Sequence, residues 1–206
     1  MNIQFSASDL IKCSAFQLAY VRKKNIPTHA SNYNKEKGLA FEDKVVHSIK
    51  GSCSEMLSTL KLNDIIIFAS HDIVTNDCLI EVKSYNPSLS SGDWYFKSCL
   101  LQTAFYKSIL MLSDGHLVTP QFKINEGYQY QEKNINPNMP YHLRFGSQEF
   151  VVNVHNPREI VSFFYNKAIA SLNYDTAKSF DASYKHKEYD ALKHLIAFES
   201  LVPSYR

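Results

Sequence analysis

The chain has 206 residues, which suits one α/β domain with a sizeable core. Its formal net charge of +2 excludes a polycation that binds nucleic acid over its whole surface. The N-terminus shows no secretory signal, and no apolar run reaches the roughly 18 residues of a membrane span, so we expect a cytoplasmic protein without a membrane partner. The four cysteines are scattered, so we expect no disulfide scaffold, no iron–sulfur cluster and no structural zinc.

The first half of the chain is predicted to alternate helices and strands. In chain order we expect a helix over 8–24, a loop over 25–34, a helix over 35–50, a buried strand over 64–70, a β-hairpin over 72–84 and a helix over 94–112. Residues 54–62 give no clear prediction.

The second half adds further strands and two helices. We expect strands over 117–119 and 121–124, a loop over 134–140, a hairpin of 143–145 with 149–154, a helix over 157–172 and a final helix over 176–199. Asn156 and Glu159 are spaced as a capping box for the helix that Pro157 begins. The fold class is therefore α/β, a mixed central β-sheet flanked by helices. We expect one domain over 1–206, with a core over about 6–125 that residues 126–206 elaborate.

The segment Ile80-Glu81-Val82-Lys83 carries the strongest chemical signal. Alternation along a strand places Glu81 and Lys83 on one face, and Asp72 on the neighbouring strand can add a second carboxylate. Oxygen ligands of this kind suit Mg²⁺ or Mn²⁺, and a lysine beside them could orient an attacking water. The alternative is a solvated strand face, because an acidic residue two positions before a lysine is common there.

Polar residues within two predicted helices support the first interpretation. Glu42 lies near the start of the helix over 35–50. Gln102 and Tyr106 are four residues apart on one face of the strongly apolar helix over 94–112. A glutamine in such a helix needs a polar partner, because burying an unpaired amide is unfavourable.

The order of these signals resembles that of the PD-(D/E)XK nuclease superfamily. The matching residues are Gly38-x3-Glu42, Asp72, Glu81-x-Lys83 and Gln102-x3-Tyr106. More narrowly, the chain resembles the RecB-like exonuclease branch, which includes CRISPR-associated RecB-like nucleases; its opening helix is similar to Ser6-Ala7-Ser8-Asp9-Leu10, Cys13 and Ala19-Tyr20. The resemblance covers about residues 6–112 and implies a restriction-endonuclease-like core.

The resemblance also implies a metal site. Asp72 and Glu81 would be direct ligands of Mg²⁺ or Mn²⁺, and the carbonyl of Val82 would be a further ligand. Glu42 would bind or support the metal from its helix.

The same resemblance implies roles for residues that act on the water and the substrate. Lys83 would position the nucleophilic water. Gln102 and Tyr106 would orient that lysine or touch the nucleic-acid backbone. The basic residues Arg22 and Lys23, at the end of the first helix, are candidates for phosphate binding, although cations there also complement the helix dipole.

Two features depart from the family pattern. His71 stands where the family often has proline or part of a Gly-x-x-Asp turn. It is a bystander, a phosphate contact or a metal ligand that would favour Mn²⁺. Many members of the branch also hold an iron–sulfur cluster with one N-terminal and three C-terminal cysteines; here Cys13 has no cysteine partners after Cys99, so the chain resembles the type without the cluster.

We therefore expect a metal-dependent nuclease, with DNA favoured over RNA and exonuclease over endonuclease. The alternatives are an RNA-cleaving endonuclease of the same fold, an inactive module that binds nucleic acid or protein, and an unrelated structural protein. The sequence leaves open a protein partner or homo-oligomer, cleavage polarity, sequence preference and the number of metal ions.

Overall fold

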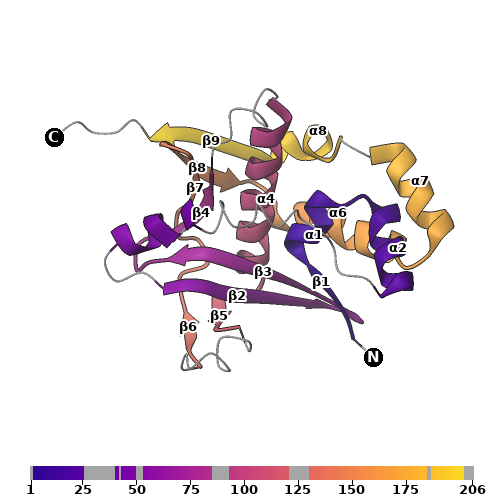
Figure 1. Cartoon of the computed structure of the whole chain (residues 1–206), viewed down its shortest axis with the longest axis horizontal. Coiled ribbons are helices and arrows are strands. Elements are labelled where there is room, and N and C mark those ends of the chain that lie inside the picture. The colour runs from indigo at the N-terminus through magenta and orange to yellow at the C-terminus, as the bar shows by residue number, and fades with distance from the viewer. Residues whose placement is uncertain are drawn as a thin grey trace.

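A computed structural model describes residues 2–25, 40–41, 43–49, 53–84, 93–120, 130–184 and 187–201. One mixed sheet runs through them, in the order β6-β5-β2-β3-β4-β7-β8-β9, with β1 beside β3 (Figure 1). The strands are β1 (Ile3–Ser6), β2 (Cys53–Leu62), β3 (Ile65–Val74), β4 (Leu79–Lys83), β5 (His116–Val118), β6 (Glu132–Asn134), β7 (Tyr141–Phe145), β8 (Gln148–Val154) and β9 (Ile196–Leu201). β1–β3 and β4–β7 are parallel pairs and the others are antiparallel, which confirms the predicted mixed sheet.

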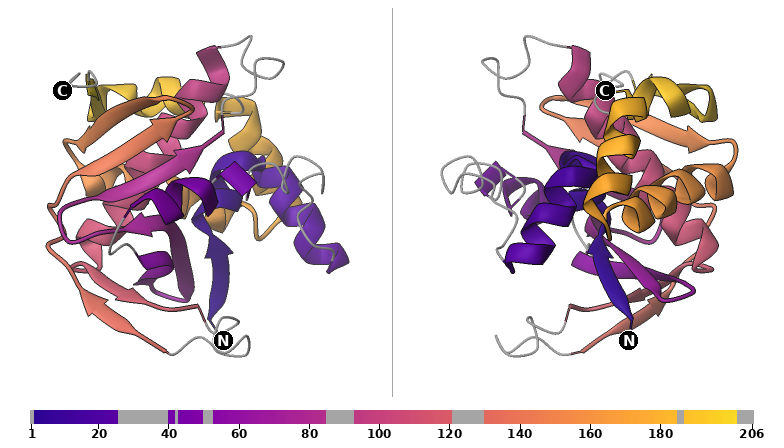
Figure 2. Two further views of the ribbon diagram at one scale, coloured as in Figure 1. Left: turned by 60° about the vertical axis from the view of Figure 1, so that its left-hand side comes forward. Right: turned by 90° about the vertical axis from the view of Figure 1, so that its right-hand side faces the viewer.

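Helices flank this sheet, as the α/β class requires. They are α1 (Ala7–Lys12), α2 (Ala15–Lys24), α4 (Asp93–Leu112), α6 (Pro157–Ala170), α7 (Tyr174–Tyr184), α8 (Glu188–Leu192) and the short 3-10 helix η1 (Lys193–Leu195). Residues 40–41 and 43–48 are also helical. The right panel of Figure 2 shows the indigo helices α1 and α2 beside the orange α6 and α7. Within the described residues, no helix is both long and apolar enough to cross a membrane.

Helix α4 is the central packing element. Its side chains are apolar around most of the circumference, which is typical of a helix covered by protein on nearly every side. It packs on one face of the sheet and on α6, where the rings of Phe105 and Phe164 stack with centroids 4.2 Å apart. The predicted helix over 94–112 is thereby confirmed.

The opposite face of the sheet is covered near β4 by the helical residues 43–48. Ile80 and Val82 of β4 pack there with Val45 and Ile73, whereas Leu79 packs in the core that contains α4. Because side chains alternate along a strand, Glu81 and Lys83 point toward α4.

Strand β2 pairs along one edge of β3, and the strands β1 and β4 share the opposite edge. β1 pairs with Ile65–Phe68, and β4 pairs only with Ile73 and Val74. Between these two stretches β3 and β4 diverge, and Asp72 lies at the start of that fork. The fork brings the carboxylates together.

Two predicted elements are wrong in detail. The helix over 8–24 is two helices, because the Ser14 side chain accepts the N–H of Gln17 and the Gln17 side chain accepts the N–H of Ser14, so that a capping box starts α2. The final helix over 176–199 ends early, and Ile196–Leu201 is instead strand β9 on β8. Only that long-range pairing distinguishes the segment from a helix.

Of the other elements, some agree with the predictions, some were not predicted, and some predictions fall on residues that are not described. Asn156 caps α6 by accepting the N–H of Glu159, as predicted. The segment without a prediction is β2, and β1 and β6 were not predicted. The expected strand over 121–124 and most of the expected helix over 35–50 lie outside the described residues.

Candidate active site

The fork between β3 and β4 is held by the carboxylate of Asp72. Its Oδ2 accepts a hydrogen bond of 2.8 Å from the backbone N–H of Val82. A backbone N–H that leaves a strand ladder needs another acceptor, and this carboxylate supplies it. The side chain of Asp72 is 17% exposed, so it lies at the border between the protein interior and solvent.

Glu81 lies deeper, with a fully buried side chain. Its Oε1 accepts hydrogen bonds from Gln102 Nε2, at 2.7 Å, and from Lys83 Nζ. Its Oε2 is buried and has no hydrogen-bond partner among the described residues. Burial and the nearby Asp72 raise the pKa of Glu81, and Lys83 opposes that rise. A buried carboxylate oxygen without a donor is unfavourable, so the site lacks a positive partner.

Lys83 brings one positive charge to this cluster. Its Nζ donates to Glu81 and to the carbonyl of Val82, at 3.2 Å, and lies 3.7 Å from Asp72 Oδ2. Burial by itself would lower the pKa of Lys83. The nearby carboxylates of Glu81 and Asp72 outweigh burial and raise this pKa well above its ordinary value, so the ammonium stays charged. With both carboxylates ionised, the three side chains carry a net charge of −1.

Two residues of α4 complete the cluster. Gln102 Nε2 also lies 3.1 Å from the Tyr106 hydroxyl, and both side chains are buried. Their spacing of four residues places them on one helix face, and the polar partner expected for Gln102 is Glu81. Burial and the charge of Glu81 raise the pKa of Tyr106, whose hydroxyl also interacts with Ser8 of α1.

His71 lies beside the cluster and has a different environment. Its Nε2 is 2.7 Å from Ser58 Oγ and its Nδ1 is 2.8 Å from the Tyr141 hydroxyl. The ring is fully buried, and this burial lowers its pKa to about 3. Both nitrogens of a neutral ring are thus occupied, a geometry that favours the bystander among the three interpretations of His71.

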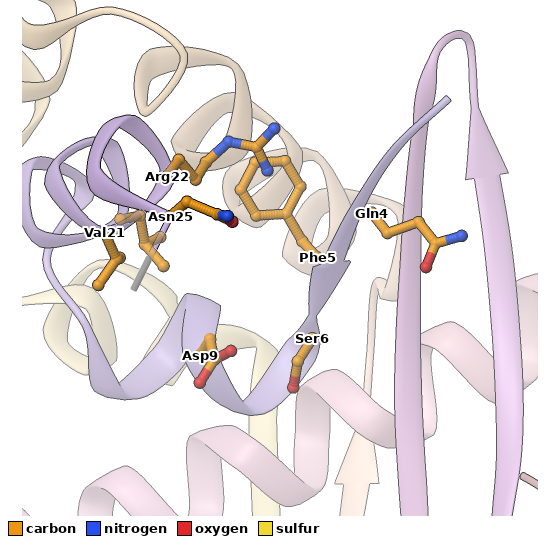
Figure 3. A pocket seen from close by; sticks show the side chains of 8 residues that line it. Gln4, Phe5, Ser6, Asp9, Val21, Arg22 and Asn25 are labelled. Atoms are coloured by element: carbon orange, nitrogen blue, oxygen red, sulfur yellow. The ribbon is translucent and has the colours of Figure 1, made fainter. Parts of the chain in front are cut away.

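The remaining candidates lie elsewhere. Arg22 stacks over the Phe5 ring at 4.7 Å and lines a separate cavity of about 270 Å³, with Asp9 and Ser6 across from it (Figure 3). Lys23 Nζ lies 4.8 Å from the centre of the Tyr174 ring. Both cations therefore rest on aromatic rings of the protein. Glu42 lies outside the described residues.

Lys12 is a further candidate for a site residue, and the sequence did not predict it. It ends α1, and its residue is exposed. Partial desolvation lowers the pKa of Lys12, and Lys83 lowers it further, whereas Glu81 raises it. The lysine therefore lies within electrostatic reach of the cluster. Its only sequence signal is its place at the end of the N-terminal segment that resembles the RecB-like branch.

The donor set fits a hard divalent cation. Carboxylates of Asp72 and Glu81 and the Val82 carbonyl are oxygen ligands, and an ion such as Mg²⁺ needs few of them because it keeps several waters. Among the described residues Glu81 Oε2 has no hydrogen-bond partner, and this feature favours the fit, because a bound cation would both supply that partner and favour the ionised form of Glu81. Among the described residues, which leave out Glu42, no group of three His, Cys, Asp or Glu side chains is placed to hold a metal.

Comparison with known proteins adds little. No family model matches the sequence, and no curated protein is significantly similar to it. Among solved structures, the chain is similar to the crystal structure of SSO0001, at 14% sequence identity over 84% of this chain and 78% of that one. The TM-score is 0.42, which is too low to argue from.

Proposed function

We propose that this protein is a divalent-metal-dependent nuclease of the PD-(D/E)XK type, of the RecB-like branch, and that its substrate is DNA. The observation that carries the proposal is Glu81, a fully buried carboxylate with one oxygen that has no hydrogen-bond partner in the described part of the chain. When both carboxylates are ionised, the two negative charges of Asp72 and Glu81 face only the one positive charge of Lys83. Structural ion pairs are normally balanced, whereas an unbalanced buried group is typical of a functional site.

The chemistry proposed is hydrolysis of a phosphodiester by a water molecule. When bound at Asp72, Glu81 and the Val82 carbonyl, Mg²⁺ or Mn²⁺ would polarise the phosphate and lower the pKa of a water. Lys83 contacts those same oxygens, so its ammonium would turn away from them to hold the attacking water in line. Water adds to phosphorus, the bond to the leaving oxygen breaks, and a proton passes to that oxygen.

The α4 residues have a positioning role in this proposal. Gln102 fixes Glu81 Oε1, and Tyr106 in turn contacts the Gln102 amide. Neither side chain can move freely, because both are buried. Glu81 is therefore presented with its free oxygen directed away from Gln102. Exonuclease action is proposed from the family resemblance alone.

The test is cleavage of end-labelled single- and double-stranded DNA, the matching RNAs and a closed DNA circle, in Mg²⁺, Mn²⁺ or EDTA. We expect metal-dependent loss of the linear DNA and survival of the circle. Glu81→Gln and Asp72→Asn should each lower the rate about a thousandfold or more, since each removes a metal ligand. Glu199→Gln, at an exposed glutamate of β9, is the matched control and should cleave like the parent.

Metal binding can be measured independently of cleavage, by the rise in melting temperature that a ligand of the folded state produces. Mg²⁺ or Mn²⁺ should raise it for the parent but not for Glu81→Gln. Lys83→Met should keep or enlarge this rise while losing cleavage, because the ammonium shares the same oxygens. Cleavage of the DNA circle would show an endonuclease in place of the proposed exonuclease, and cleavage of RNA alone would support the RNA endonuclease. Stabilisation by metal without any cleavage would support the inactive binding module.

A further inference from the structure

The two edge strands of the sheet have opposite characters. In the described part of the chain, β6 ends the sheet on one side and β9 on the other (Figure 1). β6 is only three residues long, and two of these, Glu132 and Lys133, are charged. β9 is six residues long, and Glu199 is its one charged side chain. Because short and charged edges resist pairing with another strand, β6 is protected and β9 is open to pairing.

The pairing with β8 shows which backbone groups of β9 face outward. The N–H of His155 donates to the carbonyl of Leu195 at 2.9 Å, and the register runs unbroken from there to Leu201. Since hydrogen-bonded and non-hydrogen-bonded pairs alternate between antiparallel strands, the odd-numbered residues of β9 bond to β8. The N–H and C=O groups of Phe198 and Ser200 therefore point away from β8. No hydrogen bond to these groups is found among the described residues.

An exposed aromatic side chain lies at the same edge. The ring of Phe198 packs against Phe96 of α4, at a centroid distance of 5.7 Å, and against Phe150 of β8, at 6.1 Å. Phe198 is nevertheless 42% exposed, so this aromatic cluster is open to solvent at β9. A further strand beside β9 would cover the ring and would bond to the outward-facing backbone groups at the same time.

We propose that β9 pairs antiparallel with β9 of a second copy of the chain, in a two-fold symmetric dimer whose sheet runs through both molecules. A two-fold contact requires a surface that complements itself, and an edge strand meets this requirement when it pairs antiparallel with its own copy. One strand from each copy is a small interface, so we expect a weak dimer with a Kd of about 10 μM. The inference does not depend on the proposed nuclease function.

The positions of the outward-facing groups also determine the register. Two symmetric registers pair these groups with each other along most of the strand. One is centred on Glu199 and places the two Glu199 carboxylates directly opposite each other, which is destabilising. The other is centred on Phe198, so that the two Phe198 rings are cross-strand neighbours and Glu199 faces Ala197 of the second copy. The second register avoids the like charges and covers the exposed rings, so it is the one that we propose.

The mass in solution tests the dimer. Sedimentation velocity in EDTA, from about 1 to 500 μM protein, should show a change from one chain to two. Ser200→Pro should stay monomeric, because proline removes an outward N–H and its ring fills the edge, whereas the bonds of β9 to β8 remain. Ser200→Ala keeps that N–H and is the matched control, which should dimerise like the parent.

Variants of Ala197 test the register and do not require proline in a strand. Ala197→Lys would face Glu199 of the second copy at two symmetric places and should tighten the dimer roughly fivefold, whereas Ala197→Glu should weaken it by about as much. Glu199→Gln should leave the affinity unchanged in the proposed register. A tighter Glu199→Gln dimer, with no effect of either Ala197 variant, would overturn the register centred on Phe198.

Amide hydrogen exchange reports on the edge itself. The N–H groups of Phe198 and Ser200 should exchange fast in dilute protein and slowly in concentrated protein, whereas those of Ala197 and Glu199 should exchange slowly in both. A monomer at every concentration, a dimer that persists in Ser200→Pro or an assembly larger than two chains would overturn the proposal. These measurements involve neither metal nor cleavage, so the nuclease function stands or fails separately.

Discussion

Two lysines in different regions of the molecule, one half-buried and one fully buried, have contrasting surroundings. Lys167 of α6 is fully buried and lies 3.1 Å from the Glu188 carboxylate of α8, one charge against one. Lys83, at the fork, contacts two carboxylates, one of which keeps a buried oxygen that no described residue contacts by a hydrogen bond. The first pair balances itself with groups of the chain. The second cluster is one positive charge short.

This contrast separates a structural ion pair from a candidate functional site. Lys107 gives a third case, because its buried ammonium donates to the carbonyl of Val152 and lies 3.4 Å from the Asn153 amide oxygen. Its pKa is lowered by desolvation, yet its donors find acceptors of the fold. Burial of a lysine alone therefore indicates little. An unbalanced charge and an unpartnered oxygen together indicate that the site is built for something that binds.

The largest expected effect is on cleavage and compares the two lysines directly. Lys83→Met should lower the cleavage rate about a thousandfold, because the attacking water loses its positioning group. Lys167→Met should change the rate per folded molecule less than about twofold, since its partner lies in the helical layer. Both rates are measured with Mg²⁺ below the melting temperature of each variant. Equal losses would show that the contrast between the lysines has no functional meaning.

The sequence predicted which residues lie together in this cluster better than it predicted their hydrogen-bond partners and charge balance. The spacings of Glu81 with Lys83 and of Gln102 with Tyr106 follow from the periods of a strand and a helix, so their shared faces could be foreseen. Which partner each atom takes depends on where β3 and β4 diverge. That fork arises because β1 occupies the other part of the same edge of β3, a long-range pairing that local patterns do not report.

Dependence on long-range contacts also explains the other features that the sequence did not predict. Strand β9 has a sequence that also suits a helix, and only its pairing with β8 decides the matter. Lys12 looks like an ordinary basic residue at a helix end until α1 is packed on α4. The sequence left phosphate binding and a helix-dipole role open for Arg22 and Lys23, and it could not show that each rests on an aromatic ring that the fold brings to it.

The second prediction concerns acid stability and His71. Burial lowers the pKa of His71 from 6.5 to about 3, so below neutral pH the unfolded chain takes up a proton that the folded chain does not. The free energy of unfolding should therefore fall as the pH drops, by roughly 2.5 kcal/mol between about pH 7 and pH 4.5 from this group alone. Urea unfolding at both pH values measures the change.

The control for this prediction is an exposed histidine. His71→Gln should be less stable than the parent near neutral pH, because hydrogen bonds to Ser58 and Tyr141 are lost, but its stability should depend less on pH. His47→Gln, at an exposed position, should keep the pH dependence of the parent. If His71→Gln and the parent lose stability in parallel on acidification, burial of a neutral ring is not the cause.

An effect of similar size is expected for the balanced pair. Lys167→Met leaves Glu188 without its cation and should lower the free energy of unfolding by roughly 2–3 kcal/mol. Lys193→Met breaks the exposed pair with Asp190, whose N–O distance is similar at 3.2 Å, and should change stability by less than about 0.5 kcal/mol. Chemical denaturation compares the two. Equal effects would mean that burial does not set the strength of these pairs.

The smallest expected effect has the opposite sign. Burial raises the pKa of Glu81 from 4.5 to about 8, so between these pH values the folded metal-free protein keeps a proton that the unfolded chain releases, and the free energy of unfolding falls as the pH rises. Glu81→Gln removes this titrating group and leaves Asp72 and Lys83 as a balanced pair. In EDTA near pH 7 the variant should therefore be more stable than the parent, by about 1–2 kcal/mol, with the difference vanishing in acid.

The matched measurement uses metal as the variable. Saturating Mg²⁺ supplies the missing positive charge, so it should stabilise the parent and reverse the order of the two proteins, whereas Glu81→Gln should not respond. A structural carboxylate would behave differently, because its loss would destabilise the fold in EDTA and in Mg²⁺ alike. A variant that is less stable under both conditions would place Glu81 with Glu188, as part of the scaffold, and would remove the main support for the nuclease.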